Sequence, residues 1–175
     1  VNEDKLITDI IFLENIKNEI KDTLLYDVKV LSKIKNENAP LPFNITKLQA
    51  YCSQKYGYSG QQTLEITQSL REKHKAITYN RSESQYLNEE HFAEVPERLK
   101  IIFKNLNITV DRIDTAKKPK CFDNSKVTSH HAIIPTDAEI DISKLSKEEL
   151  NVYETIADFY IIQFLPPQVI KEKTG

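Results

Sequence analysis

Several residue types are scarce in this chain of 175 residues, and their scarcity excludes some kinds of protein. There is no methionine and no tryptophan, and there are only three glycines and two cysteines. Cys52 and Cys121 are too far apart in the sequence for a zinc motif, and two cysteines do not make a disulfide framework. We therefore expect both to be reduced intracellular thiols.

Long apolar runs are absent too. No run approaches the roughly 20 residues that a membrane helix needs, and no secretory signal pattern occurs. We therefore expect no membrane partner. The chain starts at Val1 without any methionine and stops at Gly175, just after an apparent strand start at Gln168. We interpret both ends as cuts through a larger protein.

Charge of one sign is not in excess, because 24 basic and 26 acidic residues leave a net charge of −2. A stand-alone binder of duplex DNA usually carries a basic face, so bulk charge argues mildly against nucleic acid, although a local patch can still bind it. The content of hydrophobic residues (39%) and charged residues (29%) is typical of a folded domain. Composition alone predicts only an intracellular globular domain.

The hydrophobic pattern predicts a mainly α chain with a minor α+β part. An apolar stripe from Ile10 to Ile20 predicts a helix, and the alternation from Tyr26 to Ile34 predicts a half-buried strand. Residues 36–42 break regular structure. We expect a domain boundary there, so that residues 1–40 belong to one domain, residues 41–166 to another, and residues 167–175 return to the first.

Capping signals place the helices. Asn44 and Ser59 are expected N-caps of a helix over Thr46–Lys55 and of a second helix to about Lys73, with Gly57 ending the first in the left-handed conformation. We expect Leu64, Thr67 and Leu70 to share one face of the second helix. This pair is typical of helix-turn-helix domains.

Two later helices follow the same logic. One is expected from a cap at Asn88, with Pro96 in the first turn of a helix through Leu106, and another from a capping box at Ser146 to Pro166. We expect Leu99, Ile102, Phe103 and Leu106 to form the buried stripe of the helix that ends at Leu106.

Between the two helices, residues 110–129 predict a surface loop rich in lysine, which is either a solvated charge run or a phosphate contact. Its lysines are Lys117, Lys118, Lys120 and Lys126.

Residues 78–86 (TYNRSESQY) concentrate a phenol, a guanidinium, a carboxylate and several hydroxyls. A tyrosine hydroxyl can attack a phosphodiester and hold the broken strand as a phosphotyrosine, provided that positive charge lies nearby. Arg81 is two residues from Tyr79, so an extended segment would place both side chains on one face. The segment is also compatible with a surface turn that holds a half-buried tyrosine.

Residues 128–136 (TSHHAIIPT) form the second polar segment. Adjacent histidines in an extended chain point to different sides, so His130 and His131 are not expected to bind one metal ion. One of them could donate to a phosphate or shuttle a proton, or both could be solvated loop residues.

Together the two segments resemble the signature motifs of type IA DNA topoisomerases, in the form of the topoisomerase III-like members. Residues 77–84 (ITYNRSES) are similar to the family's active-site motif I-T-Y-x-R-T-D-S, and residues 130–136 (HHAIIPT) to its later H-x-A-I-x-P-T motif. Similarities at Pro40–Asn44, in the helix pair before Tyr79 and at Tyr153–Pro167 extend the resemblance over nearly the whole chain.

The resemblance implies a fold and a reaction. Residues 41–166 would form a helix-turn-helix or winged-helix-like catalytic-tyrosine domain, flanked by strand and helix pieces of the gate (arch) domain. The tyrosine attacks a single DNA strand, becomes joined to the 5′ phosphate, and the 3′ hydroxyl reseals the break after strand passage, without ATP. By motif position Tyr79 is the nucleophile, Arg81 holds the scissile phosphate, and His130 contacts it. The other predicted DNA-binding residues are Thr78, Ser82, Glu83, Ser84 and His131.

Two positions depart from the family pattern. Ser82 and Glu83 stand where threonine and aspartate are usual. Each replacement keeps its functional group, although glutamate is one methylene longer, so we expect shifted positions and retained chemistry. Ser84 matches the last serine of the motif.

The family's Mg²⁺ site is expected in another part of the parent polypeptide. Its acidic Asp-x-Asp motif precedes the tyrosine in the family and does not occur here. Asp137, Glu139 and Asp141 follow the histidine motif, and we interpret them as a polar surface strand or loop. We therefore predict no metal site in this chain, partners that are single-stranded DNA and the remaining domains of the same polypeptide, and a location in the cytoplasm with the nucleoid. The chain alone should bind DNA weakly and relax no plasmid.

Other functions remain open from the residues. A tyrosine recombinase needs a His-x-x-Arg pattern, but Ile133 and Ile134 occupy the arginine position after the two histidines. A non-catalytic helix-turn-helix module is the main rival, and it predicts that Tyr79→Phe leaves the parent's activity intact. A protein-interaction domain would show no DNA binding at all.

Overall fold

The computed structural model describes residues 10–19, 21 and 31–174, and the chain divides into two compact units. The smaller unit comprises Val1–Lys35 and Ile170–Gly175, and the larger one comprises Asn36–Val169. In the smaller unit the predicted first helix is present as α1 (Ile10–Glu19), and the last residue of its predicted stripe lies outside the described residues.

A two-stranded sheet contains β1 (Leu31–Glu37) and β2 (Gln168–Thr174). The first part of the strand predicted over residues 26–34, up to residue 30, lies outside the described residues, and β1 extends beyond its predicted end. The predicted strand start at Gln168 is confirmed.

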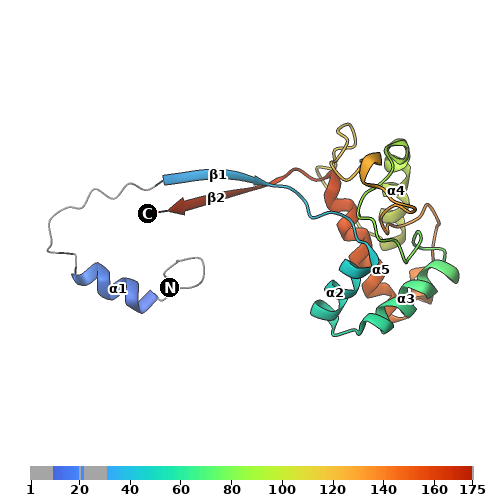
Figure 1. Ribbon diagram of the computed structural model, residues 1–175, viewed down its shortest axis with the longest axis horizontal. Helices are drawn as coiled ribbons and strands as arrows, with labels where there is room; N and C mark the ends of the chain where they lie inside the picture. The colour runs from blue at the N-terminus through green and yellow to red at the C-terminus, as the bar shows by residue number, and fades with distance from the viewer. Residues whose placement is uncertain (1–9, 20, 22–30, 175) are drawn as a thin grey trace. The chain divides into compact units, whose positions relative to one another are not determined.

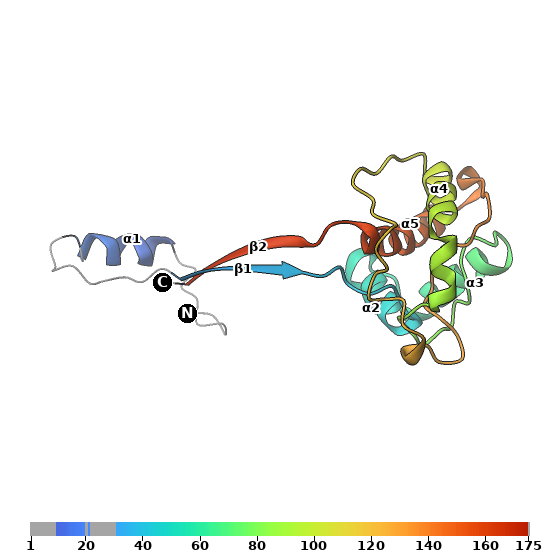
Figure 2. The same cartoon turned by 90° about the horizontal axis from the view of Figure 1, so that it is seen from above.

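The larger unit is mainly helical, as predicted. Its helices are α2 (Ile45–Tyr56), α3 (Gly60–Glu72), α4 (Val95–Leu106) and α5 (Lys147–Ile161). Short 3₁₀ helices lie between or after them: η2 (Glu89–Glu94), η3 (Asn124–Lys126), η4 (Ile142–Lys144) and η5 (Ile162–Phe164). Figures 1 and 2 show α5 running among the other three, and it packs against both α3 and α4.

The predicted caps at the helix pair are present. The side chain of Asn44 accepts a hydrogen bond from the Lys47 backbone at 2.8 Å, and that of Ser59 accepts one from Gln62 at 3.1 Å. Gly57 ends α2 at a φ of 75°, in the left-handed region that favours glycine. These caps satisfy backbone groups that the helix ends would otherwise leave unpaired.

The later caps are partly as predicted. The capping box of α5 is complete, because Ser146 and Glu149 bond to each other's backbone N–H groups. The side chain of Asn88 makes no capping bond; the side chain of Asn124 accepts the Glu89 N–H at 2.8 Å instead. A cap supplied from another segment cannot be found by reading local sequence.

The buried faces of two helices include residues beyond the predicted ones. In α3 the buried residues are Thr63, Ile66, Thr67 and Leu70, and Leu64 is only half-buried. In α4 the predicted Phe103 and Leu106 are half-buried, whereas Arg98 is buried because its guanidinium pairs with Asp137 and Glu94.

Two hydrophobic cores share α5. The first lies among α2, α3 and α5, and α5 contributes Val152, Tyr153 and Ile156 to it. The second lies around α4, and α5 contributes Ala157, Tyr160 and Ile161 to it. Because the α5 residues of the two cores adjoin in sequence, this one helix holds both halves of the unit in register.

The lysine-rich stretch is a surface loop only in part. Its lysines are exposed, but Cys121 and Phe122 are buried in the second core, and the Leu87 N–H donates to the Cys121 carbonyl at 2.8 Å. Both cysteines are free, and burial raises the pKa of Cys52 to about 11 and that of Cys121 to about 12, so neither is a ready nucleophile.

Candidate active site

The two polar segments found in the sequence lie side by side in the larger unit. Antiparallel bridges join Ile77 to Pro135 and Phe43 to Ile133, and the Thr78 N–H donates to the Ile134 carbonyl at 3.0 Å. Ile133 lies in the first core and Ile134 in the second. The second segment is therefore anchored from both sides, which holds His130 at the surface beside the first segment.

The ring of Tyr79 is in contact with a histidine and an arginine. Its centroid lies 4.2 Å from that of His130, with 40° between the ring planes, and the guanidinium carbon of Arg71 lies 4.7 Å from it. Tyr79 is half-buried and His130 is exposed. The structure thus brings together the predicted nucleophile, the predicted histidine and a cation stacked on the ring.

Arg71 was missed by the sequence analysis. It belongs to the last turn of α3, and no motif marks it. The sequence did offer one signal. The second helix was expected to end at about Lys73, and a basic residue in the last turn of a helix lies close to the segment that follows it.

The geometric argument that placed Arg81 on the same face as Tyr79 does not apply. Asn80 and Arg81 form a turn, so the segment is not extended at this point. Asn80 is buried, and its amide donates to the Thr67 hydroxyl at 3.2 Å. The Arg81 guanidinium is exposed and has no hydrogen-bond or ion-pair partner among residues 10–19, 21 and 31–174, which leaves its fork of donors free.

Three hydroxyls of the first segment bond to the protein's own backbone. Thr78 Oγ1 donates to the Ala132 carbonyl at 3.2 Å and accepts from the Ile134 N–H at 3.0 Å. Ser82 Oγ donates to the His130 carbonyl at 3.3 Å, and Ser84 Oγ donates to the Lys126 carbonyl at 3.2 Å. Ser82 and Ser84 are buried. The hydroxyls of Thr78 and Ser82 therefore tie the two segments together, and that of Ser84 ties the first segment to the loop just before the second.

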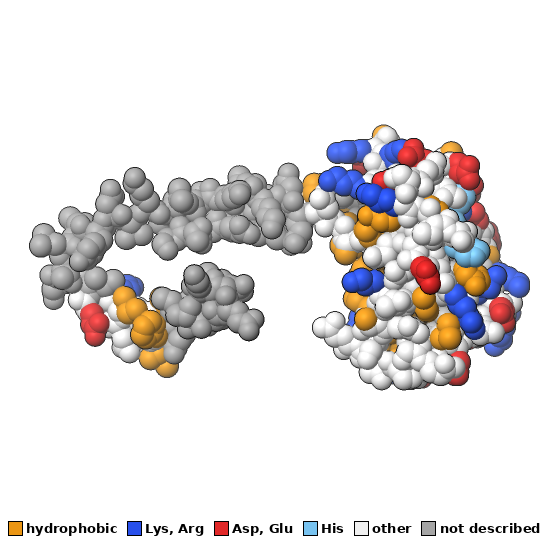
Figure 3. Space-filling model, in the orientation of Figure 1, with side chains coloured by type: hydrophobic (Ala, Val, Ile, Leu, Met, Phe, Trp, Pro, Cys, Tyr) orange, Lys and Arg blue, Asp and Glu red, His pale blue; other side chains and the backbone are white. Residues whose placement is uncertain are grey.

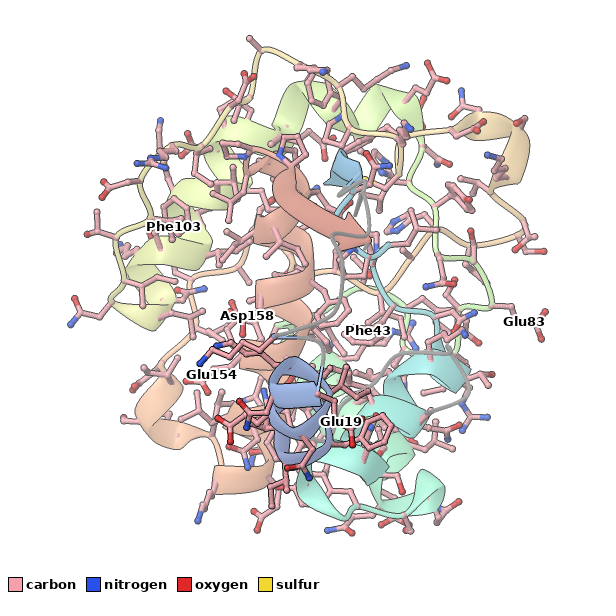
Figure 4. The ribbon with its side chains drawn as sticks, turned by 90° about the vertical axis from the view of Figure 1, so that its left-hand side faces the viewer. Glu19, Phe43, Glu83, Phe103, Glu154 and Asp158 are labelled. Atoms are coloured by element: carbon pink, nitrogen blue, oxygen red, sulfur yellow. The ribbon has the colours of Figure 1, made fainter. Side chains whose placement is uncertain are left out.

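Glu83 is exposed and projects outward at the edge of the unit, whereas Phe43 lies inside (Figure 4). The backbone carbonyl of Glu83 accepts a hydrogen bond from the Asn44 side chain at 2.9 Å. The carboxylate is therefore in solvent, where the methylene that distinguishes glutamate from aspartate has room.

His131 lies in different surroundings from its neighbour His130. It is half-buried, its ring meets that of His91 edge-on at 5.0 Å, and its Nδ1 lies 2.8 Å from the Ala132 carbonyl. Burial lowers the pKa of His131, and the charges of His91, Arg98 and His130 lower it further, while the Ala132 bond acts the other way. The two histidines thus separate as the extended-chain argument predicts.

Acidic residues do not gather into a metal site in the described part of the chain, where no three histidine, cysteine or acidic side chains could hold an ion together. Asp137 pairs with Arg98 at 2.7 Å and Glu139 with Lys104 at 2.6 Å, while Asp141 accepts from the Ser143 N–H at 3.1 Å. These acidic residues lie in a surface loop, as predicted, and their charges are already compensated.

Comparison with known proteins decides the family. A family model described as DNA topoisomerase matches residues 3–174. This chain belongs to the type IA DNA topoisomerases. It is 41% identical over 137 residues to DNA topoisomerase 3 of Vibrio cholerae, covering 77% of this chain and 21% of that protein. It is 34% identical over 168 residues to DNA topoisomerase 3 of Pasteurella multocida, covering 94% and 26%.

A solved structure shows the same fold for this topoisomerase chain. Full-length topoisomerase I of Thermotoga maritima superposes with a TM-score of 0.60 at 18% identity, over 99% of this chain and 28% of that one. The chain therefore spans about a fifth to a quarter of the length of the curated relatives it matches. No helix in its described part is long and apolar enough to cross a membrane.

Proposed function

We propose that this chain carries the DNA-cleaving tyrosine of a type IA topoisomerase, an enzyme that breaks one DNA strand, passes another through the gap and reseals the break. Its catalytic-tyrosine domain would be residues 41–166, with residues 1–40 and 167–175 belonging to the gate domain. One observation carries the proposal: Tyr79, His130 and Arg71 meet where the two family motifs lie side by side.

The reaction begins with attack by the Tyr79 hydroxyl oxygen on the phosphorus of a single-strand phosphodiester. A bond forms between that oxygen and phosphorus, the bond to the 3′ oxygen breaks, and the proton of the phenol ends on the 3′ hydroxyl. After strand passage the 3′ hydroxyl attacks the 5′-phosphotyrosine and reverses the step. The phosphotyrosine conserves the bond energy, so no ATP is needed.

Positive charge is what the phenol and the phosphate need. The guanidinium of Arg71 lies over the ring of Tyr79, where it stabilises negative charge on the phenol. Arg81 is exposed and unpaired within the described residues, so its donors can bind two phosphate oxygens. His130, in contact with the same ring, can donate to the phosphate.

The remaining predicted DNA-binding residues divide by exposure. Glu83 is exposed and can meet DNA. Thr78, Ser82 and Ser84 bond to backbone carbonyls, and His131 is half-buried. We therefore assign these four residues to positioning the segments that carry Tyr79 and His130.

The metal ion belongs to another part of the parent protein in this proposal. No three acidic, histidine or cysteine side chains of the described chain could hold an ion together, so they do not fit a Mg²⁺ site, and no step above is assigned to one. The partners of the chain are single-stranded DNA and the other domains of its polypeptide. An enzyme that acts on a bacterial chromosome would work in the cytoplasm, with the nucleoid.

The decisive test uses the full-length parent with end-labelled single-stranded DNA and Mg²⁺, for wild type and Tyr79→Phe. After denaturation we expect DNA covalently joined to the wild-type protein and none joined to the variant. An adduct that survives the substitution would move the chemistry to another residue. No adduct in either protein would favour the non-catalytic DNA-binding module. Binding of single-stranded DNA by both proteins is the control for folding.

A further inference from the structure

A pocket rich in lysine lies in the larger unit, apart from the residues that surround Tyr79. Its volume is about 540 Å³. Its walls come from the loop after α4, from Tyr86 and Lys126, and from the two stretches 38–41 and 163–167. The charged residues that line it are Lys117, Lys118, Lys120, Lys126 and Asp114. We call this site the lysine pocket. Figure 3 shows lysine and arginine side chains (blue) gathered at the upper edge of the unit, where this loop runs in Figure 1.

Half of the positive charge in the lysine pocket is not neutralised. Lys118 pairs with Glu89 at 2.5 Å and Lys126 with Asp123 at 3.2 Å. Lys117 and Lys120 are exposed and have no ion-pair partner in the described part of the chain. A protein of net charge −2 that concentrates four lysines around one cavity favours an anionic ligand there.

The rest of the pocket wall is apolar and aromatic. Leu41, Phe164, Leu165 and Pro166 line it, and Tyr86 lies in the same wall with the Lys126 ammonium 4.8 Å from its ring centre. Sites for single-stranded nucleic acid combine these features, because bases stack on aromatic or apolar surface while lysines bind the phosphates. A free inorganic anion would use the lysines alone.

The lysine pocket is connected to the Tyr79 site by one short segment. Tyr86 follows Tyr79 by seven residues, which span at most about 25 Å when fully extended. Along this path Ser82 bonds to the His130 carbonyl and Ser84 to the Lys126 carbonyl. The segment that starts at the nucleophile therefore ends at the pocket, and its Ser82 and Ser84 are bonded to the stretch from Lys126 to His130.

We propose that the lysine pocket holds the DNA strand that continues from the phosphotyrosine in the 3′ direction. This inference rests on the proposed function. A strand joined to Tyr79 through its 5′ phosphate has only its 3′ continuation left to place, and the lysine pocket offers phosphate and base contacts within a few nucleotides. It would keep the cleaved strand on this unit through contacts other than the covalent bond.

The test measures binding of a 12-nucleotide oligothymidylate, labelled at its 3′ end, to the 175-residue chain by fluorescence anisotropy at several salt concentrations. The variant is Lys117→Gln/Lys120→Gln. The matched control, Lys100→Gln/Lys147→Gln, removes two exposed lysines that do not line the pocket. Each lost phosphate contact lowers the slope of log affinity against log salt by about 0.7, so the pocket variant should lose about 1.4 in slope and roughly tenfold in affinity at 100 mM salt.

Three outcomes would overturn the inference. Equal weakening by the pocket variant and the control would mean that only bulk charge binds the strand. Wild-type binding that neither variant changes would place the strand elsewhere. In both cases the covalent adduct of Tyr79 still decides the proposed function separately. If inorganic phosphate, added at constant ionic strength, weakens the binding of the oligothymidylate, the pocket would be assigned to a free anion instead.

A second measurement uses the absence of tryptophan from the chain. Tyr86→Trp would make the only indole, placed in the wall of the lysine pocket, and a bound strand that stacks on it should quench its fluorescence. Tyr58→Trp is the control, because Tyr58 does not line the pocket. Quenching in both proteins or in neither would contradict the inference.

Discussion

Two groups of residues share the segment from Thr78 to Ser84, and they differ in what they face. Asn80, Ser82 and Ser84 are buried and bond to the protein, whereas Arg81 and Glu83 are exposed. Both groups belong to one sequence motif, so a motif match alone does not distinguish them. The comparison teaches that about half of a catalytic signature can serve to hold the other half in place.

The same division separates the two histidines of the second motif. His130 is exposed and contacts the Tyr79 ring, whereas His131 is half-buried beside His91. If the division is correct, substitutions of exposed residues should affect cleavage and leave stability unchanged. Substitutions of the bonded residues should affect stability first.

The largest effect is expected for Arg81→Ala. Removal of a donor that meets developing charge on the phosphate should slow DNA cleavage by the full-length parent about 100-fold or more. Because Arg81 is exposed, the free energy of unfolding of the chain should change by less than about 0.5 kcal/mol. Single-turnover cleavage and urea unfolding measure the two quantities. Arg81→Lys keeps the positive charge but loses the paired donors of the guanidinium, so its cleavage rate should fall between those of wild type and Arg81→Ala.

Thr78→Val should show the opposite pattern. Valine has the shape of threonine but leaves the Ile134 N–H without its hydrogen-bond acceptor, at a cost of about 1–3 kcal/mol in unfolding free energy. Thr78→Ser keeps the hydroxyl and is the control. Unchanged stability in Thr78→Val, together with lost DNA binding, would show that this hydroxyl faces DNA and that the division is wrong at this position.

Arg71→Leu tests a residue that only the structure revealed. Leucine removes the cation stacked on the Tyr79 ring, and such a contact is worth up to about 2 kcal/mol when desolvated. We expect cleavage by the parent to slow roughly tenfold, less than for Arg81→Ala. Arg71→Lys should retain part of the rate. A rate unaffected by both substitutions would leave Arg71 without a role in the chemistry.

The smallest effect concerns His131 and pH. The pKa of His131 is lowered in the folded chain from its ordinary value of about 6.5. At pH values around and below 6.5 the unfolded chain therefore binds a proton at this histidine more readily than the folded chain does. The stability that this difference contributes is complete above that value and is lost as pH falls toward the folded pKa. Urea unfolding at pH 7.5 and 5.5 should show a smaller pH-dependent loss for His131→Gln than for wild type.

Much of the fold was predictable from local sequence because it depends on local chemistry. The caps at Asn44, Ser59 and Ser146 and the left-handed Gly57 are present where the sequence placed them. The capping bond by Asn124 and the burial of Cys121 were not predicted, because both depend on segments that come together only in the folded chain.

The sequence by itself determined the family, the helix caps at Asn44, Ser59 and Ser146, and the identity of the candidate nucleophile. These depend on residue types at fixed spacing, which survive without coordinates. Only the tertiary structure decided which hydroxyls face the protein, that Arg71 stacks on Tyr79, and that four lysines surround one pocket. The physical reason is that side-chain environment depends on neighbours distant in sequence, and a turn at Asn80 and Arg81 removes the extended geometry on which their alignment with Tyr79 was argued.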